Sequence, residues 1–148
     1  MTGPIYRESY SVERGNFATA GDASRAMKNT LKRMGVDPAI IRDVAIASYE
    51  LELNLVIHSA GGSITLEIFP DRLRLTCADR GPGIPDISLA LQEGYSTATQ
   101  EVRNMGFGAG MGLPNIRRHS HEFDIESAMD AGTTITSQYR LMPNDGGK

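Results

Sequence analysis

Residues 38–58 carry the clearest helical pattern in the chain, and they limit what the rest of it can fold into. Asp37 can cap the N-terminus of such a helix, Pro38 suits its first turn, and the glycine pair at 61–62 lies beyond its end. Along this segment, small and apolar side chains recur at three- and four-residue steps: Ile41, Val44, Ser48, Leu51 and Leu55. Because such a stripe must be buried, the helix needs a second layer of structure to pack against.

The other periodic segments can supply that layer. Runs with strand character occupy residues 5–12, 63–69, 72–78, 122–128 and 133–140, and further helices are expected over residues 22–34 and 111–119. Turn residues at 70–71 and 130–132 make two of the strand pairs hairpins. We therefore expect a single domain over residues 1–148 with an α/β (α+β) two-layer sandwich fold. Its sheet is mixed and mostly antiparallel, with the helices on one face.

Composition excludes several classes of function. The 148 residues suffice for one domain, and 40% apolar with 22% charged residues is typical of a globular protein. A formal charge of -3 provides no basic surface for nucleic acid or an anionic membrane. The chain has no signal peptide and no apolar run that could span a bilayer, so we expect a cytoplasmic protein. Its single cysteine, Cys77, cannot form an internal disulfide, and its apolar neighbours predict an inert core thiol.

A second face of the long helix is polar. Glu50, Asn54 and His58 follow one another at four-residue steps, rotated away from the apolar stripe. Asparagine is unfavourable inside a helix, because its side chain competes for backbone hydrogen bonds. Two interpretations fit this face. It is either a solvated polar surface, or a site where an amide oxygen binds a hard cation beside a carboxylate base.

Two short glycine segments accompany predicted strands in the second half of the chain. Residues 79–83 (Asp-Arg-Gly-Pro-Gly) follow directly after a strand. Such a carboxylate with two glycines either forms a charged turn or lets a flat ligand approach the backbone closely. Residues 132–134 (Gly-Thr-Thr) open the last strand, and a turn of this kind is common on its own.

A stronger signal is the run at residues 106–112, Gly-Phe-Gly-Ala-Gly-Met-Gly. Its glycines alternate and lead into a predicted helix, so backbone N–H groups are exposed for an anion such as phosphate. The run is no Walker loop, because neither Lys-Ser nor Lys-Thr follows it, and its spacing differs from the dinucleotide fingerprint. The long stretch that precedes it is typical of a functional lid or of disorder.

Together, residues 50–54, 79–83, 106–112 and 132–134 resemble the N box and the three glycine boxes of the GHKL superfamily, in order and in spacing. The resemblance spans residues 37–140 and implies the Bergerat ATP-binding fold. Within the superfamily the chain most resembles the small stand-alone anti-sigma-factor serine/threonine kinases of the RsbW and RsbT type. Its short length, residues 86–97 and residues 112–116 (Gly-Leu-Pro-Asn-Ile) carry that narrower resemblance.

The resemblance implies a role for each matching residue. Asn54 binds Mg²⁺, which bridges the phosphates of ATP, and Glu50 accepts the proton of the attacking hydroxyl. Asp79 forms a hydrogen bond with the adenine amino group, and Thr133 or Thr134 completes the base pocket through water. These assignments give one catalytic residue, Glu50, and one metal ligand, Asn54.

Further ATP contacts follow from the same resemblance. Gly81 and Gly83 leave room for the adenine, with Ile84 beside them. The phosphates are wrapped by the glycine run and the residue after it: Gly106, Gly108, Gly110, Met111, Gly112 and Leu113.

Two basic side chains have open interpretations. His58 stands where the family often places a basic residue near the ribose and phosphates, and it is otherwise a structural residue at a helix end. Arg103 lies in the expected lid, residues 84–105, where it either reaches the γ-phosphate or faces solvent. The polar stretch 98–105 is an addition relative to smaller members of the family.

The resemblance implies a Mg·ATP-dependent serine/threonine protein kinase that acts on a regulatory protein, either a STAS-type antagonist or a sigma factor. The alternative is a nucleotide-gated binding module that sequesters a partner without phosphate transfer. A histidine-kinase catalytic domain fits less well, because residues 1–35 are too short for a phosphoacceptor helical hairpin. No nucleic-acid or membrane partner is expected, and the chain is a candidate homodimer.

Overall fold

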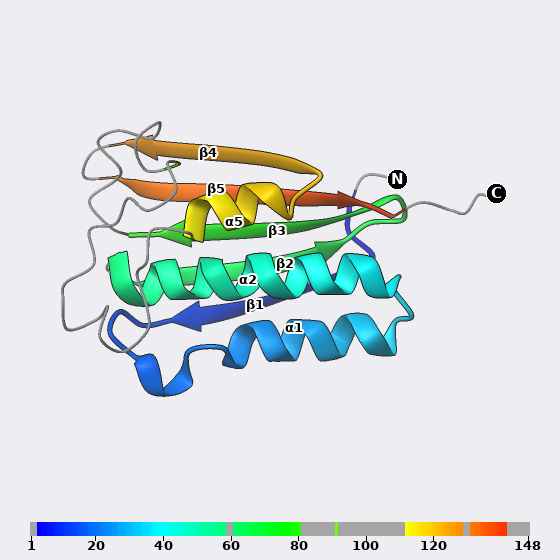
Figure 1. Ribbon diagram of the computed structural model, residues 1–148, viewed down its shortest axis with the longest axis horizontal. Helices are drawn as coiled ribbons and strands as arrows, with labels where there is room; N and C mark the ends of the chain where they lie inside the picture. Colours follow the sequence, from blue (N-terminus) through cyan, green and yellow to red (C-terminus); the bar gives the residue numbers. More distant parts are fainter. Residues whose placement is uncertain (1–2, 59–60, 81–90, 92–111, 129–130, 142–148) are drawn as a thin grey trace.

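The computed structural model describes residues 3–58, 61–80, 91, 112–128 and 131–141. Within them, five strands form one sheet in the order β1-β2-β3-β5-β4 (Figure 1). The strands are β1 (Tyr6–Val12), β2 (Gly62–Ile68), β3 (Arg72–Asp79), β4 (Glu122–Ala128) and β5 (Gly132–Arg140). All of them lie within one residue of the predicted bounds.

Every pairing between the described strands is antiparallel. The predicted hairpins β2–β3 and β4–β5 are both present, while β3 and β5 become neighbours although α5 and β4 lie between them in the chain. The expected mostly antiparallel sheet is confirmed, and the described strands contribute no parallel pair to make it mixed.

In the part of the chain that the structure describes, three helices cover one face of this sheet (Figure 1). They are α1 (Asp22–Arg33), α2 (Pro38–His58) and α5 (Gly112–Arg118), and a short 3₁₀ turn, η1 (Phe17–Thr19), precedes α1. The two-layer arrangement with helices on one face is therefore confirmed. None of the helices that the structure describes is long and apolar enough to cross a membrane.

The core lies between α2 and the sheet. All members of the predicted stripe are buried: Ile41, Val44, Ser48, Leu51 and Leu55. They meet the inward side chains of β2 and β3, which alternate along each strand, as the burial patterns of both strands show. Cys77 is part of this core cluster, and burial raises the pKa of its thiol, as expected for an inert core cysteine.

The other face of the sheet is polar. Glu67 lies opposite Arg7 on one neighbouring strand and Arg74 on the other. The carboxylate of Glu67 is 2.9 Å from the guanidinium of Arg74 and 3.7 Å from that of Arg7. Cross-strand pairs of this kind suit a solvated sheet face, so the helices need to cover only the apolar side.

Glu52 fixes α1 against α2. Its carboxylate accepts hydrogen bonds from the backbone N–H groups of Ala23 and Ser24, at 3.2 and 3.1 Å, in the first turn of α1. The N-cap residue of α1 is Gly21, which has no side chain to satisfy those donors. A glutamate from the neighbouring helix therefore takes the place of an N-cap side chain, and it is only 2% exposed.

Candidate functional site

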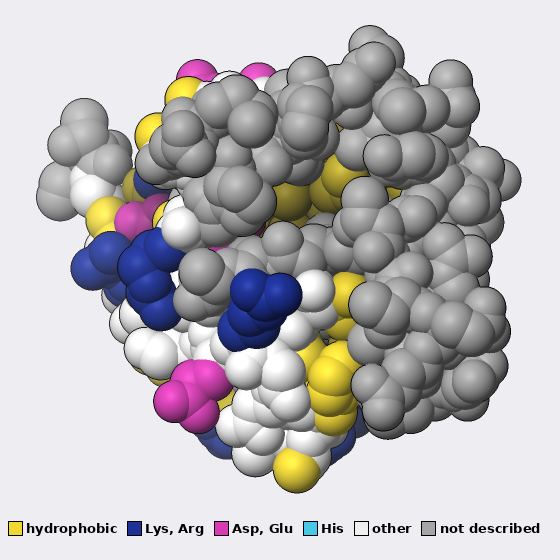
Figure 2. Space-filling model, turned by 90° about the vertical axis from the view of Figure 1, so that its left-hand side faces the viewer, with side chains coloured by type: hydrophobic (Ala, Val, Ile, Leu, Met, Phe, Trp, Pro, Cys, Tyr) yellow, Lys and Arg dark blue, Asp and Glu magenta, His cyan; other side chains and the backbone are white. Residues whose placement is uncertain are grey.

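The predicted site residues gather at one end of the molecule. The C-terminal half of α2, the end of β3 and the beginnings of β5 and α5 all lie at the left-hand end of Figure 1. Figure 2 views this end directly and shows basic and acidic side chains interspersed on its described part. The fold thus brings together segments that are far apart in the chain.

Glu50 and Asn54 meet the first residue of α5. A Cβ placed on Gly112 would lie 3.3 Å from the Glu50 carboxylate oxygen Oε1 and 3.3 Å from the Asn54 amide oxygen Oδ1. A side chain at this position would crowd both oxygens, and glycine lets the α5 backbone approach them. Two members of the polar face of α2, Glu50 and Asn54, therefore face the end of the glycine run.

Glu50 is half-buried, and its environment acts on its carboxyl group in two ways. Burial raises the pKa of Glu50 above its ordinary value, and a side-chain hydrogen bond from Asn115 acts in the opposite direction. A carboxylate with a raised pKa in a half-buried position has the properties of a general base. Asn115 belongs to α5 and was not among the predicted site residues.

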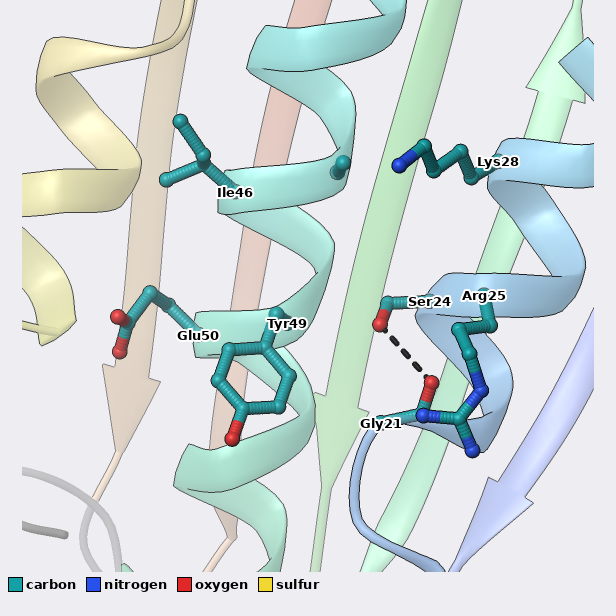
Figure 3. Close-up of a pocket in the computed structure, with 8 residues that line it drawn as sticks. Gly21, Ser24, Arg25, Lys28, Ile46, Tyr49 and Glu50 are labelled. Atoms are coloured by element: carbon teal, nitrogen blue, oxygen red, sulfur yellow. Dashed lines mark hydrogen bonds between the residues drawn. The ribbon is translucent and has the colours of Figure 1, made fainter. Parts of the chain in front are cut away.

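A groove of about 400 Å³ runs between α1 and α2 and reaches Glu50 (Figure 3). Tyr49 and Ile46 of α2 and Lys28 and Arg25 of α1 line it, and Ser24 forms a 3.1 Å hydrogen bond with the Gly21 carbonyl at its edge. In Figure 3 the Glu50 side chain lies on the side of α2 that is remote from α1, toward α5. Glu50 therefore stands between the groove and α5.

Asp79 is tied to the beginning of β5. Its carboxylate oxygen Oδ1 accepts a 2.9 Å hydrogen bond from the backbone N–H of Thr133, which is 5% exposed. The hydroxyl of Thr133 lies 2.8 Å from that of Ser127 on β4. The next residue, Thr134, is half-buried and pairs with Ala78 across the sheet. These bonds fix the position of the Asp79 carboxyl group at the sheet end.

Gly132 is required where β5 passes Asp79. Its φ is +90°, and a Cβ there would lie 2.2 Å from the Asp79 backbone oxygen. Only glycine combines this conformation with such a close approach. The Gly-Thr-Thr segment, a weak signal by itself, is therefore the segment that positions Asp79.

Several predicted positions lie outside the described residues. They are Gly81, Gly83, Ile84, Gly106, Gly108, Gly110, Met111, and the expected lid at 84–105 with Arg103, apart from residue 91. His58 ends α2, but its side chain is also outside the described part. Leu113 is described, and its half-buried side chain packs against the hydrophobic core.

A Mg²⁺ ion at this site would take most of its coordination from a bound substrate and from water, rather than from protein side chains. No group of three or more His, Cys, Asp or Glu side chains that could hold a metal occurs in the described part of the chain. Asn54 Oδ1, next to Glu50 Oε1, provides the hard oxygen that Mg²⁺ prefers. Because Mg²⁺ takes much of its coordination from substrate phosphates and water, few protein ligands would be needed here, and Asn54 Oδ1 would be one of them.

Sequence reasoning missed two contacts, those of Asn115 and Glu52. One signal pointed to Asn115: an asparagine inside a short helix directly after a glycine run has the same unfavourable propensity that drew notice to Asn54. For Glu52, helical periodicity places the side chain on a different face of α2 from Glu50 and does not indicate a partner. Its contact with α1 depends on how two helices pack.

The sequence matches a known family of proteins. Residues 41–142 match the family described as Histidine kinase-, DNA gyrase B-, and HSP90-like ATPase. The serine/threonine-protein kinase RsbT of Bacillus subtilis is 32% identical over 112 residues, which cover 73% of this chain and 78% of that protein. The anti-sigma F factor of Thermoanaerobacter sp. is 32% identical over 107 residues, which cover 68% of this chain and 71% of that protein.

A solved structure agrees on the fold. A chain of the SiaB–SiaC complex from Pseudomonas aeruginosa has a TM-score of 0.63 and 15% identity, over 89% of this chain and 88% of that chain. The family match covers the four segments that carry the GHKL resemblance, and the sequence relatives are a serine/threonine kinase and an anti-sigma factor. The chain belongs to the histidine kinase-, DNA gyrase B- and HSP90-like family of ATP-binding domains, as its four boxes predicted.

Proposed function

We propose that this protein is a Mg·ATP-dependent serine/threonine kinase that phosphorylates a regulatory protein of the STAS type. The observation that carries the proposal is the contact of Glu50 and Asn54 with Gly112, where a carboxylate and an amide oxygen meet the end of the glycine run. The similarity to a serine/threonine kinase supports the same reaction.

Asn54 and the glycine run would position the triphosphate. Asn54 Oδ1 would hold Mg²⁺, which supplies charge neutralisation for the phosphates when it is bound. Gly112 leaves the α5 backbone beside both polar oxygens of α2, close to where the phosphates would lie. Positioning and electrostatic stabilisation account for most of the catalysis in phosphoryl transfer, so these residues would contribute mainly by geometry.

Glu50 would act on the acceptor hydroxyl. The hydroxyl oxygen forms a bond with the γ-phosphorus while the bond from phosphorus to the bridging oxygen of ADP breaks, and the hydroxyl proton passes to the Glu50 carboxylate. Burial raises the pKa of Glu50, which makes its carboxylate a stronger base. The groove between α1 and α2 reaches Glu50 and gives a partner segment a route to it (Figure 3).

Asp79 would recognise the adenine. Its Oδ1 is bonded to the Thr133 N–H, an arrangement that holds the carboxyl group in a defined orientation. An acceptor so fixed at the end of β3 can receive a hydrogen bond from the exocyclic amino group of the base. This role would make the site selective for ATP over GTP, whose base carries a carbonyl at that position.

A second candidate is a nucleotide-gated binding module. The similarity to an anti-sigma F factor favours it, since that relative is named as an antagonist of a sigma factor. In this case ATP occupancy would set the affinity for a partner, and phosphate would stay on the nucleotide. For either function we propose a cytoplasmic protein that can act as a homodimer.

The test is phosphate transfer under defined conditions. The purified chain is incubated with Mg·[γ-³²P]ATP and a purified STAS-domain protein, and the modified residue is located by mass spectrometry. We expect label on a serine or threonine of the partner, loss of transfer with a chelator, and an Asn54→Ala variant whose ATP affinity no longer responds to the chelator. Stable binding of ATP and partner without any transfer would replace the kinase by the gated binder.

A further inference from the structure

Helices α2 and α5 lie side by side and meet at two points (Figure 1). At the first point Gly112, which begins α5, approaches Glu50 and Asn54 of α2. At the second, His119 directly follows α5, and its Nδ1 atom is 3.0 Å from Asp43 Oδ1 of α2. Gly112 and His119 are seven residues apart, and so are Asp43 and Glu50, so each pair shares one face of its helix. The two points are therefore equally spaced along both helices, roughly 10 Å apart.

The two contact points differ in kind. Gly112 permits a close approach, but it has no side chain that could bond to α2. The second point is a hydrogen bond between two side chains, and both are partly buried, with His119 29% and Asp43 34% exposed. Such a bond weakens with any slide or rotation of α5, since hydrogen bonds depend steeply on distance and angle. The bond at the far end can therefore fix the position that glycine allows at the near end.

The residues that follow attach the chain to the sheet. Ser120 Oγ is 2.5 Å from the hydroxyl oxygen of Ser137, which is 2.8 Å from that of Tyr139, and both of these β5 residues are fully buried. His121 Nδ1 accepts a 2.8 Å hydrogen bond from the backbone N–H of Arg140. The end of α5 therefore stays attached to β5 even without its side-chain bond to α2.

We propose that His119, bonded to Asp43, is a positioning residue that sets where α5 sits along α2 and so holds the end of the glycine run beside Glu50 and Asn54. Its effect on nucleotide binding rests on the proposed function, in which the glycine run contacts the phosphates. A partly exposed pair with a structural role alone would add a little stability and leave the nucleotide affinity of the folded chain unchanged. The two roles therefore differ in what binding measurements show.

The first experiment compares two ligands on the full chain, Mg·ATP by calorimetry and adenosine by NMR titration. In His119→Ala and in Asp43→Ala, Mg·ATP should bind roughly three- to thirtyfold more weakly, because the glycine run is no longer held beside α2. Adenosine has no phosphates, so its affinity should equal that of the parent. The combined variant should bind Mg·ATP no more weakly than either single variant, since both remove the same bond. Equal losses for the two ligands, or losses that add in the combined variant, overturn the proposal.

Matched variants separate the hydrogen bond from the bulk of the side chain. The amide nitrogen of asparagine is as many bonds from Cα as histidine Nδ1, whereas that of glutamine corresponds to Nε2. His119→Asn should therefore recover most of the Mg·ATP affinity, and His119→Gln should not. His121→Ala removes a histidine that is bonded to β5, and it should bind Mg·ATP like the parent. An asparagine variant as weak as the alanine variant, or an equal loss in His121→Ala, contradicts the proposed role.

Amide hydrogen exchange provides a readout that needs no nucleotide. The amides of α5 should exchange faster in His119→Ala and Asp43→Ala than in the parent, while those of β5 keep the exchange rates of the parent. Unchanged exchange in α5 would show that the bond does not hold this helix. None of these measurements needs a partner protein or turnover. A parent that binds Mg·ATP and transfers no phosphate would therefore defeat the kinase assignment alone, and the affinities and exchange rates decide the role of His119.

Discussion

Helix α2 carries two glutamates on its two sides, and their surroundings differ in kind. Glu52 faces α1, is 2% exposed, and is bonded to the backbone N–H groups of Ala23 and Ser24. Glu50 faces α5, is half-buried, and has a side-chain amide as its hydrogen-bond donor. Backbone groups cannot move without unwinding a helix, whereas a side-chain donor can yield to a ligand.

The difference shows that burial alone does not identify a functional carboxylate. Glu52 is the more buried of the two, yet its oxygens serve to cap a helix that has glycine at its own N-cap. Glu50 keeps a groove on one side and the end of the glycine run on the other. The kind of partner separates the structural glutamate from the proposed catalytic one.

The largest expected effect is that of Glu50→Gln on phosphate transfer, with Glu52→Gln as its control. Glu50→Gln keeps size and most hydrogen bonding but removes the base, so phosphate transfer to the partner should fall by roughly a hundredfold or more, while Mg·ATP binding persists. Glu52→Gln should leave the transfer rate per folded molecule close to that of the parent. Single-turnover transfer and calorimetric ATP binding measure both. Equal losses in the two variants would remove the distinction.

Asp79 tests the distinction between carboxylates bonded to backbone groups and those bonded to side chains. Like Glu52 it accepts a hydrogen bond from a backbone N–H, at 2.9 Å, but the GHKL resemblance makes it a ligand for adenine. Asp79→Asn can keep the bond from Thr133 and should still lose about 1.5–3 kcal/mol of ATP binding, roughly a ten- to hundredfold loss of affinity. Calorimetry with ATP and with GTP checks it. If the parent binds both nucleotides equally, Asp79 belongs with Glu52 as a structural carboxylate.

Local sequence patterns were enough to predict the positions of the helices and strands. The stripe from Ile41 to Leu55 predicted the buried face of α2, and predicted helix and strand bounds lie within one residue of the observed ones. Helix periodicity, turn residues and strand alternation act over a few residues, so a single sequence contains them. The four boxes then predicted the family, and the match of residues 41–142 to the family model confirmed that prediction.

Contacts between helices and strands could not be predicted from local sequence patterns. The capping of α1 by Glu52 and the bond from Asn115 to Glu50 join residues far apart in the chain. Neither follows from a local pattern, because each depends on the angle and offset at which two helices pack on the sheet. The roles of Asn54, Asp79 and the glycines as ATP ligands stay predictions.

The stability of the fold should depend on Glu52. Glu52→Gln offers one acceptor oxygen in place of two and turns an NH₂ group toward buried N–H donors of α1, so we expect a loss of about 1–3 kcal/mol. For a chain of this size each kcal/mol lowers Tm by roughly 2–4 °C. Urea unfolding with an unchanged m value measures the loss. Stability equal to that of the parent would mean that α1 finds another cap.

The smallest expected effect is of opposite sign and depends on pH. Burial raises the pKa of Glu50 in the folded chain above its unfolded value, so ionisation of this group costs folding stability. Below the unfolded pKa the group is protonated in both states and imposes no such cost. The cost grows as the pH rises through the folded pKa and is constant above it.

Glu50→Gln should therefore be more stable than the parent at neutral pH, with the advantage closing as the pH is lowered toward the unfolded pKa. The gain should be smaller than the loss in Glu52→Gln, because Glu50 is only half-buried and water screens part of the effect. Thermal unfolding of the parent and both variants across this pH range measures the two signs together. A Glu50→Gln variant that is less stable than the parent at neutral pH would show that Glu50, like Glu52, holds the fold together.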